Sequence, residues 1–277
     1  MAINITPVTN HRERERSIVY PVYSRRSAGL SIGVNLFPDK KTCQFDCPYC
    51  EVFPFSANAV FDLRQMEDDL RYTIKEAIKE NILIKDICFS GNGEPTLSPA
   101  FFSSLESAEK IRAEMTPNAK LVVITNGAGL LQRQVFNYLK KAAASPSLDI
   151  WLKLDAGTND WYQKINRCTI HHEKLLEKIK EFTASAAHSA PVTIQTMLCA
   201  INGEEPPKEE TTAWEILLCE LAASGNIRKV QLYGKARSAP EDPLASLLPE
   251  KYLKDRAASL QRLFKDNGIL TPIEIYI

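Results

Sequence analysis

The chain has 277 residues, a length that one large α/β domain with a single hydrophobic core can account for. Its 44% hydrophobic and 25% charged residues are close to the globular average, which excludes disordered and fibrous proteins. The 34 Lys and Arg residues balance the 34 Asp and Glu residues, and a neutral total can still hide a basic patch, so charge neither favours nor excludes a nucleic-acid partner.

The N-terminal region carries no targeting signal that the sequence reveals. A charged run at residues 11–16 is not followed by the apolar segment of a secretory signal. No run in the chain approaches the ~18 apolar residues of a membrane-spanning helix. We therefore expect a cytoplasmic protein without a membrane partner, with an N-terminal extension at residues 1–27 and one domain at residues 28–277.

Short apolar runs alternate along the chain with longer segments of helical spacing. Strands are predicted at residues 29–37, 85–90, 120–125, 148–154, 192–198, 229–233 and 273–277. Helices are predicted at residues 62–80, 100–115, 130–143, 173–184, 212–223 and 251–266. This alternation favours right-handed βαβ units and a parallel sheet. The repeats are too few for a closed barrel of eight, so we predict an α/β fold: a partial (βα)6-type parallel barrel or an open twisted sheet in a single domain.

Three of the seven cysteines, Cys43, Cys47 and Cys50, lie within eight residues, directly after the first predicted strand. Thiolates this close in sequence can hold one soft metal centre. A structural zinc site needs four closed ligands, and no further Cys or His follows until Cys88, although zinc stays an alternative. A cubane iron–sulfur cluster with three protein ligands would keep one iron open for a substrate or cofactor. The lone cysteines are interpreted as buried thiols: Cys88, Cys168, Cys199 and Cys219.

The second predicted strand is followed by Asn92, Gly93 and Glu94. A glycine lets the backbone approach a ligand closely, and a carboxylate beside it can receive an ammonium group. The alternative interpretation is a tight turn before the next helix. Asn126 follows the third strand, where Asn-Gly also favours a simple turn.

Later strands also carry polar residues near their carboxyl ends, where active sites of parallel sheets lie. Lys153 and Asp155 alternate with apolar residues, which places both on one face of the fourth strand. A neutralised ion pair is the alternative. Gln195 on the fifth strand, and Tyr233 and Arg237 on and after the sixth, are tentative substrate residues. Arg237 is suited to an anionic group because a guanidinium binds carboxylate or phosphate through two hydrogen bonds.

The spacing Cys-x₃-Cys-x₂-Cys, with the aromatic Tyr49 before the last cysteine, resembles the signature of the radical S-adenosylmethionine superfamily. The resemblance implies that Cys43, Cys47 and Cys50 hold a 4Fe-4S cluster. The open iron would be chelated by the amino and carboxylate groups of S-adenosylmethionine, and Tyr49 would lie near the adenine.

The same resemblance extends to the residues at the other strand ends. Asn92-Gly93-Glu94 resembles the Gly-Gly-Glu motif of the superfamily, in which the carboxylate binds the amino group of S-adenosylmethionine, although Asn92 replaces the first glycine. By the same resemblance Asn126 borders the cofactor, and Lys153 and Asp155 contact its ribose and carboxylate.

Residues from about 28 to 239 look like one branch of the superfamily, which includes the tRNA wybutosine-synthesising iron–sulfur enzymes. Those enzymes carry further cysteines upstream of the triplet, and here no cysteine precedes Cys43. The implied activity is reductive cleavage of S-adenosylmethionine and abstraction of a hydrogen atom from a substrate that the sequence does not identify: a small molecule, a tRNA or a protein. Electrons would come from a flavodoxin- or ferredoxin-like donor.

Four alternatives stay open at this stage. They are a tRNA base-modifying enzyme of the wybutosine type, an enzyme that activates a glycyl radical on a partner protein, an electron-transfer iron–sulfur protein, and a zinc-binding structural module.

Overall fold

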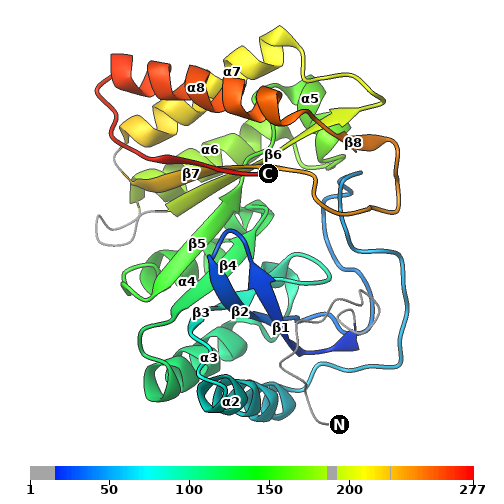
Figure 1. The fold of residues 1–277 in the computed structure, drawn as a ribbon, viewed down its shortest axis with the longest axis vertical. Helices are drawn as coiled ribbons and strands as arrows, with labels where there is room; N and C mark the ends of the chain where they lie inside the picture. Colours follow the sequence, from blue (N-terminus) through cyan, green and yellow to red (C-terminus); the bar gives the residue numbers. More distant parts are fainter. Residues whose placement is uncertain (1–15, 186–191, 225) are drawn as a thin grey trace. The chain divides into compact units, whose positions relative to one another are not determined.

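The computed structural model describes residues 16–185, 192–224 and 226–277 (Figure 1). Residues 1–15 of the predicted N-terminal extension lie outside this part. The chain divides into two compact units, which we describe separately. The first comprises residues up to 43, 54–125 and 147–149, and the second comprises residues 44–53, 126–146 and 150–277.

The first unit contains four strands in the order β1-β2-β3-β4. The strands β2 (Gly29–Val34), β3 (Ile84–Phe89) and β4 (Lys120–Thr125) are parallel, and β1 (Val19–Ser24) runs antiparallel to β2. Two helices, α2 (Leu63–Lys79) and α3 (Phe101–Met115), follow β2 and β3 in the chain, and a short 3-10 turn, η1 (Pro95–Leu97), precedes α3. The edge strand β1 was not predicted. It contains Pro21, and proline is tolerated in an edge strand because its missing N–H need not pair with a neighbouring strand.

The helix α2 shows why the sequence forms its elements where it does. Asp62 is the N-cap, and its side chain accepts a hydrogen bond of 2.8 Å from the backbone N–H of Gln65. Met66, Leu70 and Ile74 recur at a spacing of four residues and are buried, which gives the helix one apolar face.

The second unit contains the strands β5 (Leu148–Lys153), whose first residues belong to the first unit, β6 (Val192–Ile201), β7 (Ile227–Gly234) and β9 (Ile273–Tyr276), in that order and parallel. A short strand, β8 (Ala245–Leu247), pairs antiparallel with β6. The helical elements are η2 (Ala128–Leu131), α4 (Arg133–Ala142), α5 (Asn159–Ile165), α6 (His172–Ser185), α7 (Lys208–Ala223) and α8 (Glu250–Asp266). Figure 1 shows α7 and α8 side by side.

All ten residues of β6 are buried, as expected for a parallel strand that is covered on both faces. Its register places Gln195 opposite Lys153 of β5 and Gln231 of β7, and Gln231 is opposite Glu274 of β9. Register partners in a parallel sheet face the same side, so a polar row crosses four neighbouring strands of the second unit. Among the described helices, none has the length and apolar character needed to span a membrane.

Candidate active site

The cysteine triplet is divided between the two units. Cys43 is the last residue of its segment of the first unit and is exposed, whereas Cys47 and Cys50 belong to the second unit and are half-buried. Within residues 16–185, 192–224 and 226–277, no three side chains of His, Cys, Asp or Glu converge as the ligands of a metal ion do. The ligand set therefore stays a prediction, and each unit is considered on its own.

In the first unit, the residue before Cys43 is paired with the segment after β3. The backbone N–H of Thr42 donates to the carbonyl of Asn92 at 2.9 Å, and the N–H of Glu94 donates to the carbonyl of Thr42 at 2.9 Å. A Cβ on Gly93 would lie 1.8 Å from the Thr42 carbonyl oxygen, far inside van der Waals contact. Only glycine permits this approach, so Gly93 fixes the chain at the entrance to the triplet.

Glu94 is a buried carboxylate at the carboxyl end of β3. Its Oε1 accepts hydrogen bonds from the backbone N–H of Thr96 at 3.2 Å, from the Thr96 hydroxyl at 2.7 Å and from the Thr125 hydroxyl at 2.8 Å. Asn92 is also buried, and its amide donates to the carbonyl of Phe37 at 2.9 Å. Asn92 thus ties together two segments of backbone, a role that a second glycine could not fill.

In the second unit, the triplet loop is held by the residues that follow α5. The backbone N–H of Asp46 donates to the carbonyl of Asn166 at 3.0 Å, and the ring of Phe45 packs edge-on against Tyr162 with 5.8 Å between centroids. The side-chain amide of Asn166 lies 3.4 Å from the sulfur of Cys47 and 3.0 Å from Asp155 Oδ2, and it donates to both. Asn166 therefore links the cysteine loop to the end of β5.

Lys153, Tyr49, Asp155 and Tyr233 form a polar network beside this link. Tyr49 and Asp155 are buried, and Lys153 and Tyr233 are half-buried. The Lys153 ammonium donates to the hydroxyls of Tyr49 at 2.6 Å and Tyr233 at 3.0 Å, and lies 3.6 Å from Asp155 Oδ2. The Tyr49 hydroxyl donates to Asp155 Oδ2, and the backbone N–H of Met197 donates to Oδ1 at 2.9 Å. These partners offset the desolvation of two buried charges.

Burial and neighbouring charges set the protonation of this network. Burial lowers the pKa of Lys153, but Asp155, followed by Tyr233 and Cys47, outweighs it, and the pKa of Lys153 is raised overall. Burial, then the charge of Asp155, raises the pKa of Tyr49. Lys153 thus stays an ammonium and Tyr49 a neutral hydroxyl donor.

The donor set around the triplet fits an iron–sulfur cluster. Burial raises the pKa of the Cys47 thiol to about 11, and the nearby Lys153 charge acts in the opposite direction. A coordinated metal deprotonates a thiol outright, and hydrogen bonds to the sulfurs tune such clusters. Cys47 already receives an amide hydrogen bond from Asn166. Soft thiolates, one of them with an N–H donor, suit iron and sulfide.

The other predicted residues have local partners. The side-chain oxygen of Asn126 accepts a hydrogen bond of 2.9 Å from the N–H of Ala128, which makes a turn before η2. The amide of Gln195 donates to Gln231 at 2.7 Å, and both side chains are fully buried. Arg237, the candidate for a substrate anion, donates instead to Glu51 at 2.7 Å, directly after the triplet. Of the lone cysteines, Cys88, Cys168 and Cys199 are buried and Cys219 is half-buried.

Two positioning residues were not predicted from the sequence: Asn166 and Glu210. Glu210 of α7 accepts hydrogen bonds from the N–H groups of Gly157 at 2.7 Å and Thr158 at 2.8 Å, and from the Thr158 hydroxyl at 2.5 Å. A Cβ on Gly157 would lie 2.1 Å from the backbone nitrogen of Trp214, so α7 packs directly on the loop after Asp155. No local pattern signals a contact between residues more than fifty positions apart.

Asp155→Asn should destabilise the fold and uncover its coupling to Lys153. The substitution leaves a largely buried ammonium without its carboxylate, so we expect a loss of about 2–4 kcal/mol in the free energy of unfolding. Urea unfolding measures it. In a double-mutant cycle with Lys153→Met, the double variant should lose less than the sum of the two single variants, by about 1–3 kcal/mol. Strict additivity would show that the two charges are not coupled.

His172 makes stability depend on pH below neutrality. Burial lowers the pKa of His172 from 6.5, although the Ala156 backbone and Glu173 act in the opposite direction, and its ring stacks on Tyr162 with 4.5 Å between centroids. The unfolded chain therefore takes up this proton more readily than the folded chain, and stability present above pH 6.5 is lost as the pH falls. The free energy of unfolding of His172→Gln should fall less than that of the wild type between about pH 8 and about pH 5. Parallel pH curves for the two proteins would contradict this assignment.

Comparison with known proteins identifies a family that the chain matches. The model of the Radical SAM superfamily matches residues 40–208. The UPF0026 protein slr1464 of Synechocystis sp. is 30% identical over 225 residues, which are 79% of this chain and 76% of that protein. The GTPase Obg of Brachyspira hyodysenteriae is 29% identical over 179 residues, which are 63% of this chain. The chain spans only 24% of the length of that protein.

Two solved structures show the same fold at low sequence identity. SuiB of Streptococcus suis, bound to S-adenosylmethionine, has a TM-score of 0.62 at 14% identity, over 85% of this chain and 48% of SuiB. TYW1 with a lysine-pyruvate adduct bound has a TM-score of 0.56 at 15% identity, over 84% of this chain and 73% of TYW1. The prediction of an α/β fold of the partial-barrel type is thereby confirmed.

The family match covers more than half of the chain and includes the triplet, Glu94, Lys153 and Asp155. The prediction of an iron–sulfur cluster and S-adenosylmethionine as cofactors is confirmed by this membership. The chain belongs to the Radical SAM superfamily, whose enzymes act through radical chemistry.

Proposed function

We propose that the protein cleaves S-adenosylmethionine reductively at a 4Fe-4S cluster held by Cys43, Cys47 and Cys50, and abstracts a hydrogen atom from a bound substrate. The observation that carries this proposal is the double connection between the triplet loop and the end of β5. Asp155 accepts a hydrogen bond from Tyr49 of that loop, and Asn166 donates hydrogen bonds to both Asp155 and Cys47. A structural metal site has no need of a buried Lys–Asp pair beside its ligands.

When bound, the cluster supplies the electron that splits S-adenosylmethionine into methionine and a 5′-deoxyadenosyl radical. Glu94 would bind the ammonium group of the methionine part, because a carboxylate is a strong partner for a cation. Lys153 would bind an anionic group and Asp155 would accept hydrogen bonds from ribose hydroxyls. Tyr49 would orient the adenine. Gly93, Asn92 and Asn126 would shape the backbone around the cofactor, and Gln195, Tyr233 and Arg237 would face the substrate.

The reducing partner is proposed by chemical class, a flavodoxin- or ferredoxin-like electron donor. Among the solved structures, the fold is shared by TYW1 and by SuiB bound to its precursor peptide SuiA, with a TM-score of 0.64 for the latter. A fold common to both does not select the wybutosine branch, nor a partner protein carrying a glycyl radical.

Anaerobic reconstitution with iron and sulfide tests the proposal. The reconstituted protein should be brown, and reduction by dithionite with S-adenosylmethionine present should release 5′-deoxyadenosine and methionine. A brown protein that releases neither would be an electron-transfer protein. A colourless protein that retains zinc would be a structural module. Either result would overturn the proposal.

A further inference from the structure

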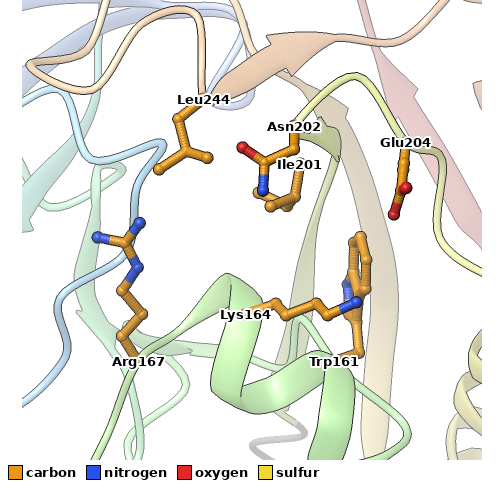
Figure 2. A pocket seen from close by; sticks show the side chains of 7 residues that line it. All are labelled: Trp161, Lys164, Arg167, Ile201, Asn202, Glu204 and Leu244. Atoms are coloured by element: carbon orange, nitrogen blue, oxygen red, sulfur yellow. The ribbon is translucent and has the colours of Figure 1, made fainter.

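A pocket in the second unit lies outside the network described above. It is lined by Trp161, Lys164, Arg167, Ile201, Asn202, Glu204 and Leu244 (Figure 2). The space between these residues is about 490 Å³ when the part open to solvent is included. Its walls come from α5 and the loop after it, from the end of β6 and the turn that follows, and from the residue before β8. The pocket thus lies where β6 ends, at the carboxyl edge of the parallel strands.

The wall after β6 is a tight turn with a fixed backbone. Ile201 and Glu204 form a bridge across it, and Asn202 and Gly203 both have positive φ, 54° and 78°. The N–H of Asn202 donates to the carbonyl of Leu244 at 2.8 Å, which joins the turn to the third wall. The turn therefore presents the Asn202 amide and the Glu204 carboxylate from a preformed scaffold.

Two cations line the opposite side, and only one of them has its charge balanced. Arg167 donates to both oxygens of Glu241 at 2.8 Å and lies 3.7 Å from Asp46. Lys164 is exposed and, among residues 16–185, 192–224 and 226–277, has no carboxylate within 4.0 Å. Glu204 is likewise exposed and has no cation within 4.0 Å in the same part of the chain. The pocket thus carries one positive and one negative group that do not pair with each other.

This charge pattern discriminates between classes of ligand. A simple anion would be attracted by Lys164 but repelled by Glu204. A simple cation would be attracted by Glu204 but repelled by Lys164. A molecule that carries both a carboxylate and an ammonium group satisfies both side chains. Trp161, Ile201 and Leu244 form the apolar part of the lining, against which a hydrocarbon or aromatic side chain can lie.

We propose that this pocket binds a zwitterion of the α-amino-acid type, with its carboxylate toward Lys164, its ammonium toward Glu204 and its side chain on Trp161. The pocket and the candidate active site are adjacent in the sequence. Arg167 lines the pocket, and the residue before it, Asn166, donates hydrogen bonds to Cys47 and Asp155. That the bound amino acid is the substrate rests on the proposed function. The binding itself does not.

Fluorine NMR titration of the full, anaerobically reconstituted chain tests the binding, with three probes that share one aromatic body. They are para-fluorophenylalanine, a zwitterion; para-fluorophenylpropionate, an anion; and para-fluorophenethylamine, a cation. We expect the zwitterion to bind about fivefold more tightly than either singly charged probe, the size of effect that exposed charge pairs give. Equal or tighter binding of a singly charged probe would overturn the proposal.

Variants assign the two charges separately. Lys164→Gln should weaken the zwitterion and the anion about fourfold and leave the cation unchanged, whereas Glu204→Gln should weaken the zwitterion and the cation. Asn202→Gly keeps the positive φ and removes only the side-chain amide. Any change in binding in this variant therefore reports the contact with the amide and not the shape of the turn. Lys174→Gln, an exposed lysine on α6, is the matched control and should change nothing. Binding that is indifferent to both Lys164→Gln and Glu204→Gln would refute the assignment.

The titration and the assay for 5′-deoxyadenosine together separate the proposed ligand of the pocket from the proposed radical function. Selective binding of the zwitterion by a chain that releases no 5′-deoxyadenosine would support the proposed ligand of the pocket and refute the radical function. Release of 5′-deoxyadenosine without selective binding would do the opposite.

Discussion

Cys47→Ala should abolish both the cluster and the cleavage of S-adenosylmethionine. Cys47 is the cysteine whose sulfur receives the amide of Asn166, and the loop around it is fixed through Asp46 and Tyr49. Without this thiolate two protein ligands remain, which is too few to hold a cubane. After anaerobic reconstitution, we expect bound iron and sulfide to fall to background and 5′-deoxyadenosine to fall by at least about a hundredfold.

Cys219→Ala is the matched control for this variant. Cys219 lies on α7, and its half-buried thiol has no part in the triplet. Its replacement should leave iron, sulfide and 5′-deoxyadenosine at wild-type amounts. Product formation that survives Cys47→Ala, or that fails equally in Cys219→Ala, would mean that the metal site is assigned to the wrong residues.

Gly93→Ala should have the next largest effect, through the backbone. The added Cβ would lie 1.8 Å from the Thr42 carbonyl oxygen and 2.6 Å from its carbonyl carbon. Both are backbone atoms, so the overlap is relieved only if the two hydrogen bonds between Thr42 and residues 92–94 break or lengthen. We expect a loss of about 2–4 kcal/mol in the free energy of unfolding. The segment leading into Cys43 would move with Thr42.

The functional consequence of Gly93→Ala should exceed its cost in stability. Iron incorporation and 5′-deoxyadenosine formation should both fall, by about tenfold or more, at temperatures where the variant is still folded. Gly268→Ala is the control, because Gly268 has φ of 68° and nothing within 4 Å of an added Cβ. That variant is expected to lose about 1 kcal/mol of stability and no activity. Wild-type iron content and turnover in Gly93→Ala would show that the Thr42–Gly93 contact does not position the triplet.

The regular elements were predictable because their signals are local. The strand predicted at residues 120–125 is β4, Lys120–Thr125, and the helix predicted at 62–80 is α2, Leu63–Lys79, with Asp62 as its cap. Both signals lie within the segment itself, in a β-branched run and in a capped apolar periodicity. The seven-residue helix α5 and the three-residue strand β8 were missed, since elements this short show less than two periods of any pattern.

The candidate site was predictable only in its motif-bearing half. The spacing of Cys43, Cys47 and Cys50 and the position of Glu94 could be recognised because each stands in a short motif. Asn166 and Glu210 were not recognisable, because their roles come from contacts with Cys47 and Gly157 that arise only when distant segments fold together. For Asn126 and Arg237 the sequence marks a polar residue, but the partner that each finds within the chain, Ala128 or Glu51, depends on the fold.

The proposed function requires a four-iron cluster with one iron that S-adenosylmethionine can reach. Mössbauer spectroscopy of the protein reconstituted with iron-57 tests it directly, with and without S-adenosylmethionine. We expect about four irons per chain, one of which changes its isomer shift when S-adenosylmethionine is added while the others do not. Four irons that all keep their parameters, or a protein that holds zinc and no sulfide, would contradict it.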